Sequence, residues 1–78
     1  MPADVREALA NAMLLEAYNE RPPYQRNDYL GWITRALQPA TRQKRLRQML
    51  QELRRGDRYM NMVWRPRRSA NMHHRLGR

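Results

Sequence analysis

The feature that most restricts the fold is one amphipathic stretch in the second half of the chain, residues 39–56. It opens with Pro39, which suits the first turn of a helix, and ends with Gly56, a residue favoured just after one. Its apolar residues recur three or four positions apart, at Leu46, Met49, Leu50 and Leu53. That spacing predicts a helix with one apolar face, which must pack against other elements.

Prolines divide the rest of the chain into further helical segments. One begins after Pro2, with Asp4 as the expected N-cap and a break near Asn11, and it stops at the Pro22–Pro23 pair. In the next segment, the residues that share one helical face, with Trp32 beside them, are Tyr29, Leu30, Ile33, Ala36 and Leu37.

No run in the sequence alternates apolar and polar residues as a half-buried strand does. We therefore predict an all-α fold, a small bundle of three or four short helices with a disordered basic C-terminal tail. The residues expected to have structural roles in this bundle are Asp28, Tyr29, Trp32, Ile33, Arg42, Leu46, Leu50 and Leu53.

The helical pattern ends at Gly56. Residues 57–78 are rich in arginine, contain a proline and show no sustained periodicity, which is typical of a disordered segment. The sequence thus predicts a helical module at residues 1–56 and a flexible basic tail at residues 57–78. The apolar residues between Tyr59 and Trp64 leave open that the first part of the tail docks on the helices.

Positive charge is concentrated in the second half of the chain. Residues 39–78 contain twelve basic and two acidic residues, and residues 1–38 contain four basic and five acidic ones. All but one of the basic residues are arginine, which binds phosphate and carboxylate groups through two donors at once. A GC-rich coding sequence also favours arginine. An anionic partner is expected, with nucleic acid, an acidic protein and anionic lipid as candidates.

We predict one electropositive binding surface on the outer side of the last helix and on the tail. Its expected members are Lys44, Arg45, Arg47, Arg54, Arg55, Arg58, Arg65, Arg67 and Arg68. Tyr59 and Trp64, which lie among these arginines, are candidates for stacking on nucleic-acid bases. The alternative is a solvated helix face that only keeps the protein soluble.

Arg42 differs from the other arginines because helical spacing places it on the apolar stripe, one turn before Leu46. A cation there needs an acidic or carbonyl partner. The sequence offers Asp28 or Glu20, so we expect Arg42 to have a structural role in an ion pair.

The sequence holds few groups for catalysis or metal binding. It contains no cysteine, its only serine is Ser69, and its two histidines, His73 and His74, are adjacent in the expected tail. We therefore expect no enzymatic activity, cofactor or metal site. The longest apolar run is too short to span a membrane, and no signal peptide is evident. A cytoplasmic protein, monomeric by default, is the expectation.

The stretch "PPYQRNDYLGWITRALQPATRQKRLRQMLQELRRG", together with "PADVREAL" near the start, resembles the C-terminal helical module of the YdeI/OmpD-associated, or bacteriocin-protection, family of bacteria. The residues that carry the resemblance are Pro23, Arg26, Asp28, Tyr29, Trp32, Ile33, Ala36, Pro39, Thr41, Arg42, Arg45 and Gly56. Tyr24 and Ala40 depart from the family pattern, which has serine and glutamate there.

This resemblance implies a compact helical module over about residues 2–56 and implies no catalytic residues. The expected function is that of a non-enzymatic accessory protein linked to protection against bacteriocins or antimicrobial peptides, acting through its arginine-rich surface. The alternatives are a nucleic-acid-binding module that uses the same surface and peripheral attachment to an anionic membrane, with Trp64 as the anchor.

Overall fold

The structure is a computed structural model, and it describes residues 1–65. Its elements in chain order are α1 (Ala3–Asn11), α2 (Leu15–Glu20), α3 (Pro23–Thr34), α4 (Pro39–Arg55), β1 (Arg58–Tyr59) and β2 (Met62–Val63). Four helices carry the fold and the two strands are very short, so the predicted all-α class with three or four helices is confirmed.

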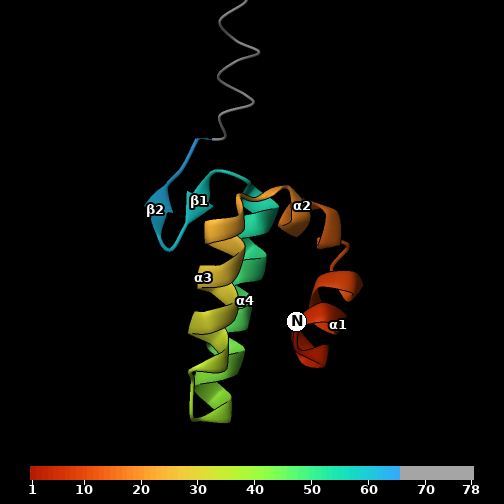
Figure 1. Cartoon of the computed structure of the whole chain (residues 1–78), viewed down its shortest axis with the longest axis vertical. Helices are drawn as coiled ribbons and strands as arrows, with labels where there is room; N and C mark the ends of the chain where they lie inside the picture. Colours follow the sequence, from red (N-terminus) through yellow and green to blue (C-terminus); the bar gives the residue numbers. More distant parts are fainter. Residues whose placement is uncertain (66–78) are drawn as a thin grey trace, which may run out of the picture.

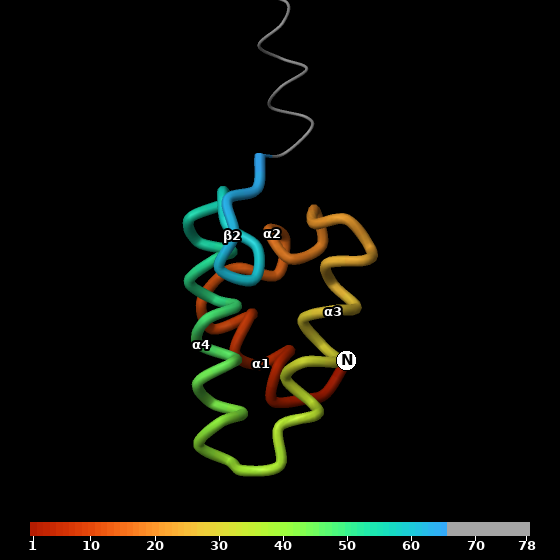
Figure 2. Tube along the Cα trace, turned by 90° about the vertical axis from the view of Figure 1, so that its left-hand side faces the viewer, coloured from red at the N-terminus to blue at the C-terminus, as the bar shows by residue number. Residues whose placement is uncertain are grey.

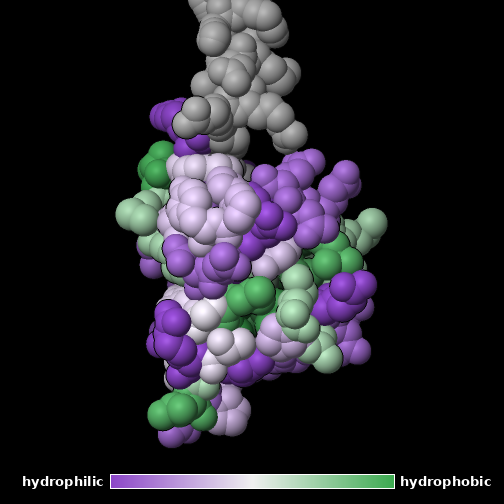
Figure 3. Space-filling view, viewed as in Figure 1, coloured by the Kyte–Doolittle hydropathy of each residue, from purple (hydrophilic) through white to green (hydrophobic). Residues whose placement is uncertain are grey.

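The helices α3 and α4 run side by side in opposite directions, joined by a short turn at one end of the molecule (Figure 1). In the view turned by 90°, α1 is seen between α3 and α4 (Figure 2), and its buried residues Val5 and Leu9 belong to the core that these helices share. The core where these helices meet contains Val5, Leu9, Leu14, Tyr18, Tyr29, Ile33, Leu46, Met49 and Leu53. On the face seen in Figure 3, hydrophobic residues reach the surface at the seam beside α1.

Proline and glycine set the ends of the helices as predicted. Pro23 and Pro39 begin α3 and α4, each in the first turn, where the missing N–H costs no helical hydrogen bond. Gly56 follows α4 in the left-handed conformation, with φ of 82°, and its N–H donates to the carbonyl of Glu52 over 2.9 Å. A residue without a Cβ adopts this conformation at little cost.

The start of α1 differs from the prediction that Asp4 is its N-cap. Pro2 occupies the cap position and no side chain caps the helix. Asp4 lies inside the helix, where its Oδ1 accepts from the N–H of Val5 over 2.9 Å, and its carboxylate pairs with Arg42 of α4. Asp4 therefore forms an ion pair with α4 and does not cap α1.

The break after α1 is a Schellman motif with an unusual residue. The N–H of Leu14 donates to the carbonyl of Leu9 over 2.8 Å, and the N–H of Met13 donates to that of Ala10 over 3.0 Å. Met13 has φ of 61° and is 89% exposed. Glycine is the usual residue here. The backbone of Met13 is therefore strained, and its exposed side chain makes no packing contacts that would offset the strain.

The buried face of α4 is displaced from the apolar stripe read from the sequence. Met49 is completely buried, whereas Leu50, at the other edge of the stripe, is only half-buried. Arg45 is half-buried and Glu52 is buried on the side of Met49. The reason is that α3 and the β1–β2 hairpin cover this side of the helix.

The first part of the predicted tail is a β-hairpin that packs on the helices, as the sequence left open. Arg58 pairs with Val63 and Tyr59 with Met62 in antiparallel register. The turn residues Met60 and Asn61 both have positive φ, 50° and 66°, as a type I′ turn requires. The remainder of the predicted tail, with Arg67 and Arg68, lies outside the described residues.

Replacing Met49 by alanine should lower the free energy of unfolding by about 2–5 kcal/mol, because it opens a cavity in the core. The matched change Leu50→Ala should cost clearly less, because half of that side chain already contacts water. Urea unfolding followed by circular dichroism measures both. Equal losses for the two variants would show that the buried face of α4 is not displaced.

Replacing Met13 by glycine should raise the free energy of unfolding by about 1 kcal/mol, since glycine accepts positive φ without a Cβ clash. Met13→Ala is the control, because alanine removes the exposed side chain and keeps the strain. Thermal unfolding of both variants tests this. The assignment of strain fails if the glycine variant is no more stable than the alanine variant.

Candidate functional site

The outer face of α4 carries the candidate site. We define this outer face by the exposed polar residues of the helix: Gln43, Lys44, Arg47, Gln51, Arg54 and Arg55. None of them is acidic. The one acid of α4 is Glu52, which is 4% exposed and points into the protein. The outer face therefore presents positive charge with no acidic residue of its own helix beside it.

The arginines expected on one surface fall into two groups. Arg45 donates to the carbonyl of Trp32 over 2.7 Å, and its guanidinium lies 5.3 Å from the centre of the Trp32 ring. Lys44, Arg47 and Arg54 are exposed, and within residues 1–65 no hydrogen bond or ion pair engages them. Arg45 thus serves packing, while these three cations remain available to a partner.

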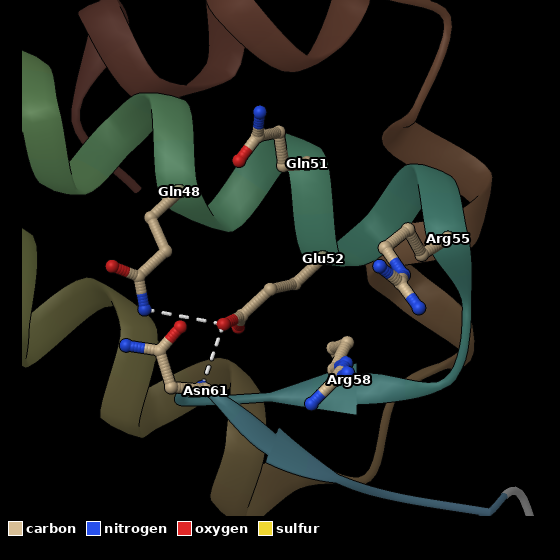
Figure 4. A pocket seen from close by; sticks show the side chains of 6 residues that line it. All are labelled: Gln48, Gln51, Glu52, Arg55, Arg58 and Asn61. Atoms are coloured by element: carbon tan, nitrogen blue, oxygen red, sulfur yellow. Dashed lines mark hydrogen bonds between the residues drawn. The ribbon is translucent and has the colours of Figure 1, made fainter.

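Arg55, Arg58 and Arg65 complete the described part of the predicted surface. The Nε of Arg55 donates to Oδ1 of Asp57 over 3.2 Å, and this hydrogen bond holds the pKa of the Asp57 carboxyl below its usual range. Arg58 is half-buried on β1, and Arg65 is exposed at the end of the described chain. The structure brings Arg55 and Arg58 to the same end of α4 (Figure 4).

Arg42 forms the ion pair predicted for it, but with an acid that the sequence argument did not name. Its Nε and Nη2 donate to the two carboxylate oxygens of Asp4, over 2.9 and 3.1 Å. These hydrogen bonds hold the pKa of Asp4 below its usual range. Asp28 instead accepts from the hydroxyl of Tyr59. Arg42 therefore ties α4 to α1.

The side chain of Glu52 is the centre of a buried polar network. Its Oε1 accepts from the Tyr29 hydroxyl and from the N–H of Met60 over 2.9 Å. Its Oε2 accepts from the N–H of Asn61 over 2.8 Å and from Nε2 of Gln48 over 3.1 Å. One carboxylate thus joins α3, α4 and the turn of the hairpin.

These contacts decide the ionisation of the pair. Burial raises the pKa of the Glu52 carboxyl, but the hydrogen bonds from Tyr29 and from the turn outweigh burial and hold that pKa below its ordinary value. Burial, together with the hydrogen bond to Glu52, raises the pKa of the Tyr29 hydroxyl. At neutral pH the carboxylate is therefore ionised and the phenol keeps its proton.

Two further buried polar residues escaped the sequence analysis. Arg21 is 4% exposed; its Nη1 donates to Oε1 of Gln25 over 2.9 Å and its Nη2 to the carbonyl of Glu52 over 3.0 Å. The Gln25 side chain is fully buried and donates to the hydroxyl of Tyr24 over 3.1 Å. Arg21 thereby gives a second donor to a carbonyl at the C-terminal end of α4 that also accepts from the N–H of Gly56.

The aromatic side chains proposed for base stacking are both engaged within the protein. Tyr59 packs edge-on against Tyr24 and Tyr29, and burial with the hydrogen bond to Asp28 raises its pKa to about 12. Trp64 lies against Arg21, whose guanidinium is 4.5 Å from the ring centre. Both rings thus already have partners within the protein.

A shallow pocket of about 300 Å³ lies between α4 and the hairpin (Figure 4). Its lining residues are Gln48, Gln51, Glu52, Arg55, Arg58 and Asn61. Both oxygens of Glu52 are occupied by the hydrogen bonds described above, so the groups left to the solvent are mainly guanidinium and amide donors. The surface of hydrogen-bond donors on the outer face of α4 thus continues through the pocket onto β1.

The described part of the chain holds no group of three side chains placed to bind a metal ion. Nor is any helix within it long and apolar enough to cross a bilayer.

Replacing Glu52 by glutamine should lower the free energy of unfolding at neutral pH by about 2–3 kcal/mol, because it weakens hydrogen bonds to a buried charge. The pKa of Glu52 is depressed in the folded state, so its contribution is present above the unfolded carboxyl pKa, about 4.3, and is lost as the pH falls through the folded value. The difference between wild type and Glu52→Gln should therefore shrink in acid.

Glu7→Gln, at an exposed position of α1, is the matched control for this change. Urea unfolding between pH 7 and pH 3 measures all three proteins. If Glu52→Gln is as stable as the control at neutral pH, Glu52 is not the centre of the network.

Comparison with known proteins identifies the family of this chain. A family model described as "OmdA: Bacteriocin-protection, YdeI or OmpD-Associated" matches residues 1–56, which span α1 to α4. No curated protein and no solved structure matches the chain. The family match covers more than half of the sequence and ends at the residue that caps α4. The chain belongs to the bacteriocin-protection family of YdeI or OmpD-associated proteins.

Proposed function

We propose that this member of the bacteriocin-protection family is a non-enzymatic accessory protein that binds an anionic partner through the outer face of α4. The observation that carries the proposal is the separation of charge on this helix. Lys44, Arg47 and Arg54 are exposed and unengaged within the described chain, whereas the only acid of the helix is buried and fully hydrogen-bonded.

The contacts of the other arginines support this proposal. Arg21, Arg42 and Arg45 each have a structural partner. Arg21 binds a buried amide and a carbonyl, Arg42 binds a carboxylate, and Arg45 binds a carbonyl and lies over an indole ring. Of the cations on the outer face, Arg55 pairs with Asp57, whereas Lys44, Arg47 and Arg54 have no such task. A set of unpaired cations on a rigid helix suits recognition of carboxylate or phosphate groups.

The inventory of reactive groups supports a binding role over catalysis. Residues 1–65 contain no serine, cysteine or histidine, so a Ser–His or Cys–His pair of nucleophile and general base cannot form there. The polar cluster around Glu52 is satisfied by its own hydrogen bonds and serves to hold the hairpin.

The rival explanation is a solvated face that only confers solubility. The two explanations differ in whether position or total charge matters. Solubility depends on the net charge of the whole chain, while a binding surface depends on where the charges lie.

We expect the double variant Arg47→Gln, Arg54→Gln to elute from a heparin column at clearly lower salt than wild type. The control is Arg6→Gln, Arg35→Gln, which removes the same charge from exposed positions outside α4 and should elute close to wild type. Circular dichroism checks that both variants fold. Equal shifts for the two double variants, or no retention of wild type, would contradict a binding surface on α4.

A further inference from the structure

We infer that the anionic partner of the outer face is double-stranded nucleic acid, bound through its phosphate backbone and without reading of bases. This inference rests on the proposed function and names the class of partner for the same surface. It follows from what the outer face lacks as much as from what it contains.

The outer face has no apolar anchor. The large apolar residues that the described structure exposes all lie outside α4: Met1, Met13, Tyr24, Leu37, Met62 and Val63. Protein partners usually centre on buried aromatic or aliphatic residues surrounded by a polar rim. A helix that lies in a membrane surface inserts an apolar face into the lipid. Phosphate contacts, by contrast, need only hydrogen-bond donors and positive charge.

The exposed amides fit the same partner. Gln43 and Gln51 lie among the cations of the outer face, and neither has a hydrogen-bond partner in the described part of the chain. Amide groups are regular donors to phosphate and sugar oxygens alongside arginine and lysine. The acid-free composition also avoids repulsion between the surface and a closely spaced row of negative charges.

The length of the cationic row suits a duplex. Lys44 and Arg55 are eleven residues apart on one continuous helix, which corresponds to about 16 Å. The major groove of B-form DNA is about 12 Å wide. A straight row of this length reaches phosphates on both sides of a groove while the helix stays rigid. The pairing of Arg42 and Arg45 with α1 and α3 keeps α4 in place.

Single strands suit the surface less well. Proteins that bind single strands combine basic grooves with free aromatic faces on which bases stack. Here Trp64 lies against Arg21, Trp32 lies against Arg45, and Tyr59 packs between two other tyrosines. Because these rings are occupied, stacking adds little and the repeated phosphates of a duplex become the better ligand.

The C-terminal end of a helix carries partial negative charge, which opposes an anion. In this protein two donors bind the Glu52 carbonyl there, the N–H of Gly56 and the Arg21 side chain. Arg54 and Arg55 occupy the last turn, and Arg58 follows on β1. The charge of these residues offsets the helix dipole at the end where the hairpin begins.

The test measures binding of the full chain to a short duplex DNA, to one of its strands alone and to vesicles rich in phosphatidylserine, by fluorescence anisotropy and by co-sedimentation at several salt concentrations. We expect tighter binding to the duplex than to the single strand or the vesicles, with the same affinity for duplexes of different sequence. The double variant Arg47→Gln, Arg54→Gln should reduce the slope of log affinity against log salt by about 2, since each lost phosphate contact removes about 0.9. The control Arg6→Gln, Arg35→Gln should keep the slope of wild type.

Each other outcome overturns a defined part of the argument. Tighter binding to the single strand or to vesicles, or a preference for one duplex sequence, overturns this inference while binding through α4 stands. Loss of slope in the control as large as in the α4 variant overturns the assignment of the surface. Absence of binding to all three probes, together with no retention on heparin, overturns the proposed function as well.

Discussion

The buried carboxylate of Glu52 is the interaction on which the C-terminal half of the fold depends. Burying a charge is costly unless hydrogen bonds replace its water, and here four donors do so. One donor comes from α3, one from α4 and two from the hairpin turn. The same residue offers its backbone carbonyl to Gly56 and Arg21, so the side chain and the main chain of Glu52 organise different neighbours.

Whether an arginine has a partner within the protein depends on where it lies in this arrangement. Where an arginine lies against another element, it finds a carbonyl, a carboxylate or a ring, as Arg21, Arg42 and Arg45 do. On the outer face of α4, Arg55 finds Asp57 just beyond the helix, whereas Arg47 and Arg54 find no partner within the described chain. Because Glu52 has turned inward, no acid of the helix remains outside to neutralise these cations. The outer face thus has no acidic residue because the one acid of the helix is buried and hydrogen-bonded inside the protein.

The helices were predictable because their signals are local. Pro23, Pro39 and Gly56 act on their own backbone, and the spacing of apolar residues repeats within each helix. The hairpin was not predictable in this way. Its strands are two residues long and Met60 is a poor residue for a type I′ turn, so only Asn61 gave a turn signal. The turn is favoured by a carboxylate eight residues earlier in the chain, an interaction that propensities do not contain.

The candidate site shows the same limit. The exposure of Lys44, Arg47 and Arg54 followed from helical geometry alone, whereas the packing of Arg45 required knowledge of where Trp32 lies. Helical spacing placed Arg42 on the apolar stripe and so predicted its ion pair. Glu52 lies beyond the Met49 edge of that stripe, further out than Arg45, so helical spacing alone gave no signal for a buried acid.

The positive φ of Met60 has a consequence for the order in which the chain assembles. A hairpin of this size is not stable alone in water, and a methionine in the left-handed conformation weakens it further. The turn becomes favourable only when Glu52 is already oriented on a formed α4 and held by Tyr29. We therefore expect α3 and α4 to pair before the hairpin forms. The turn thus depends on a carboxylate that α3 and α4 hold in place once they have paired.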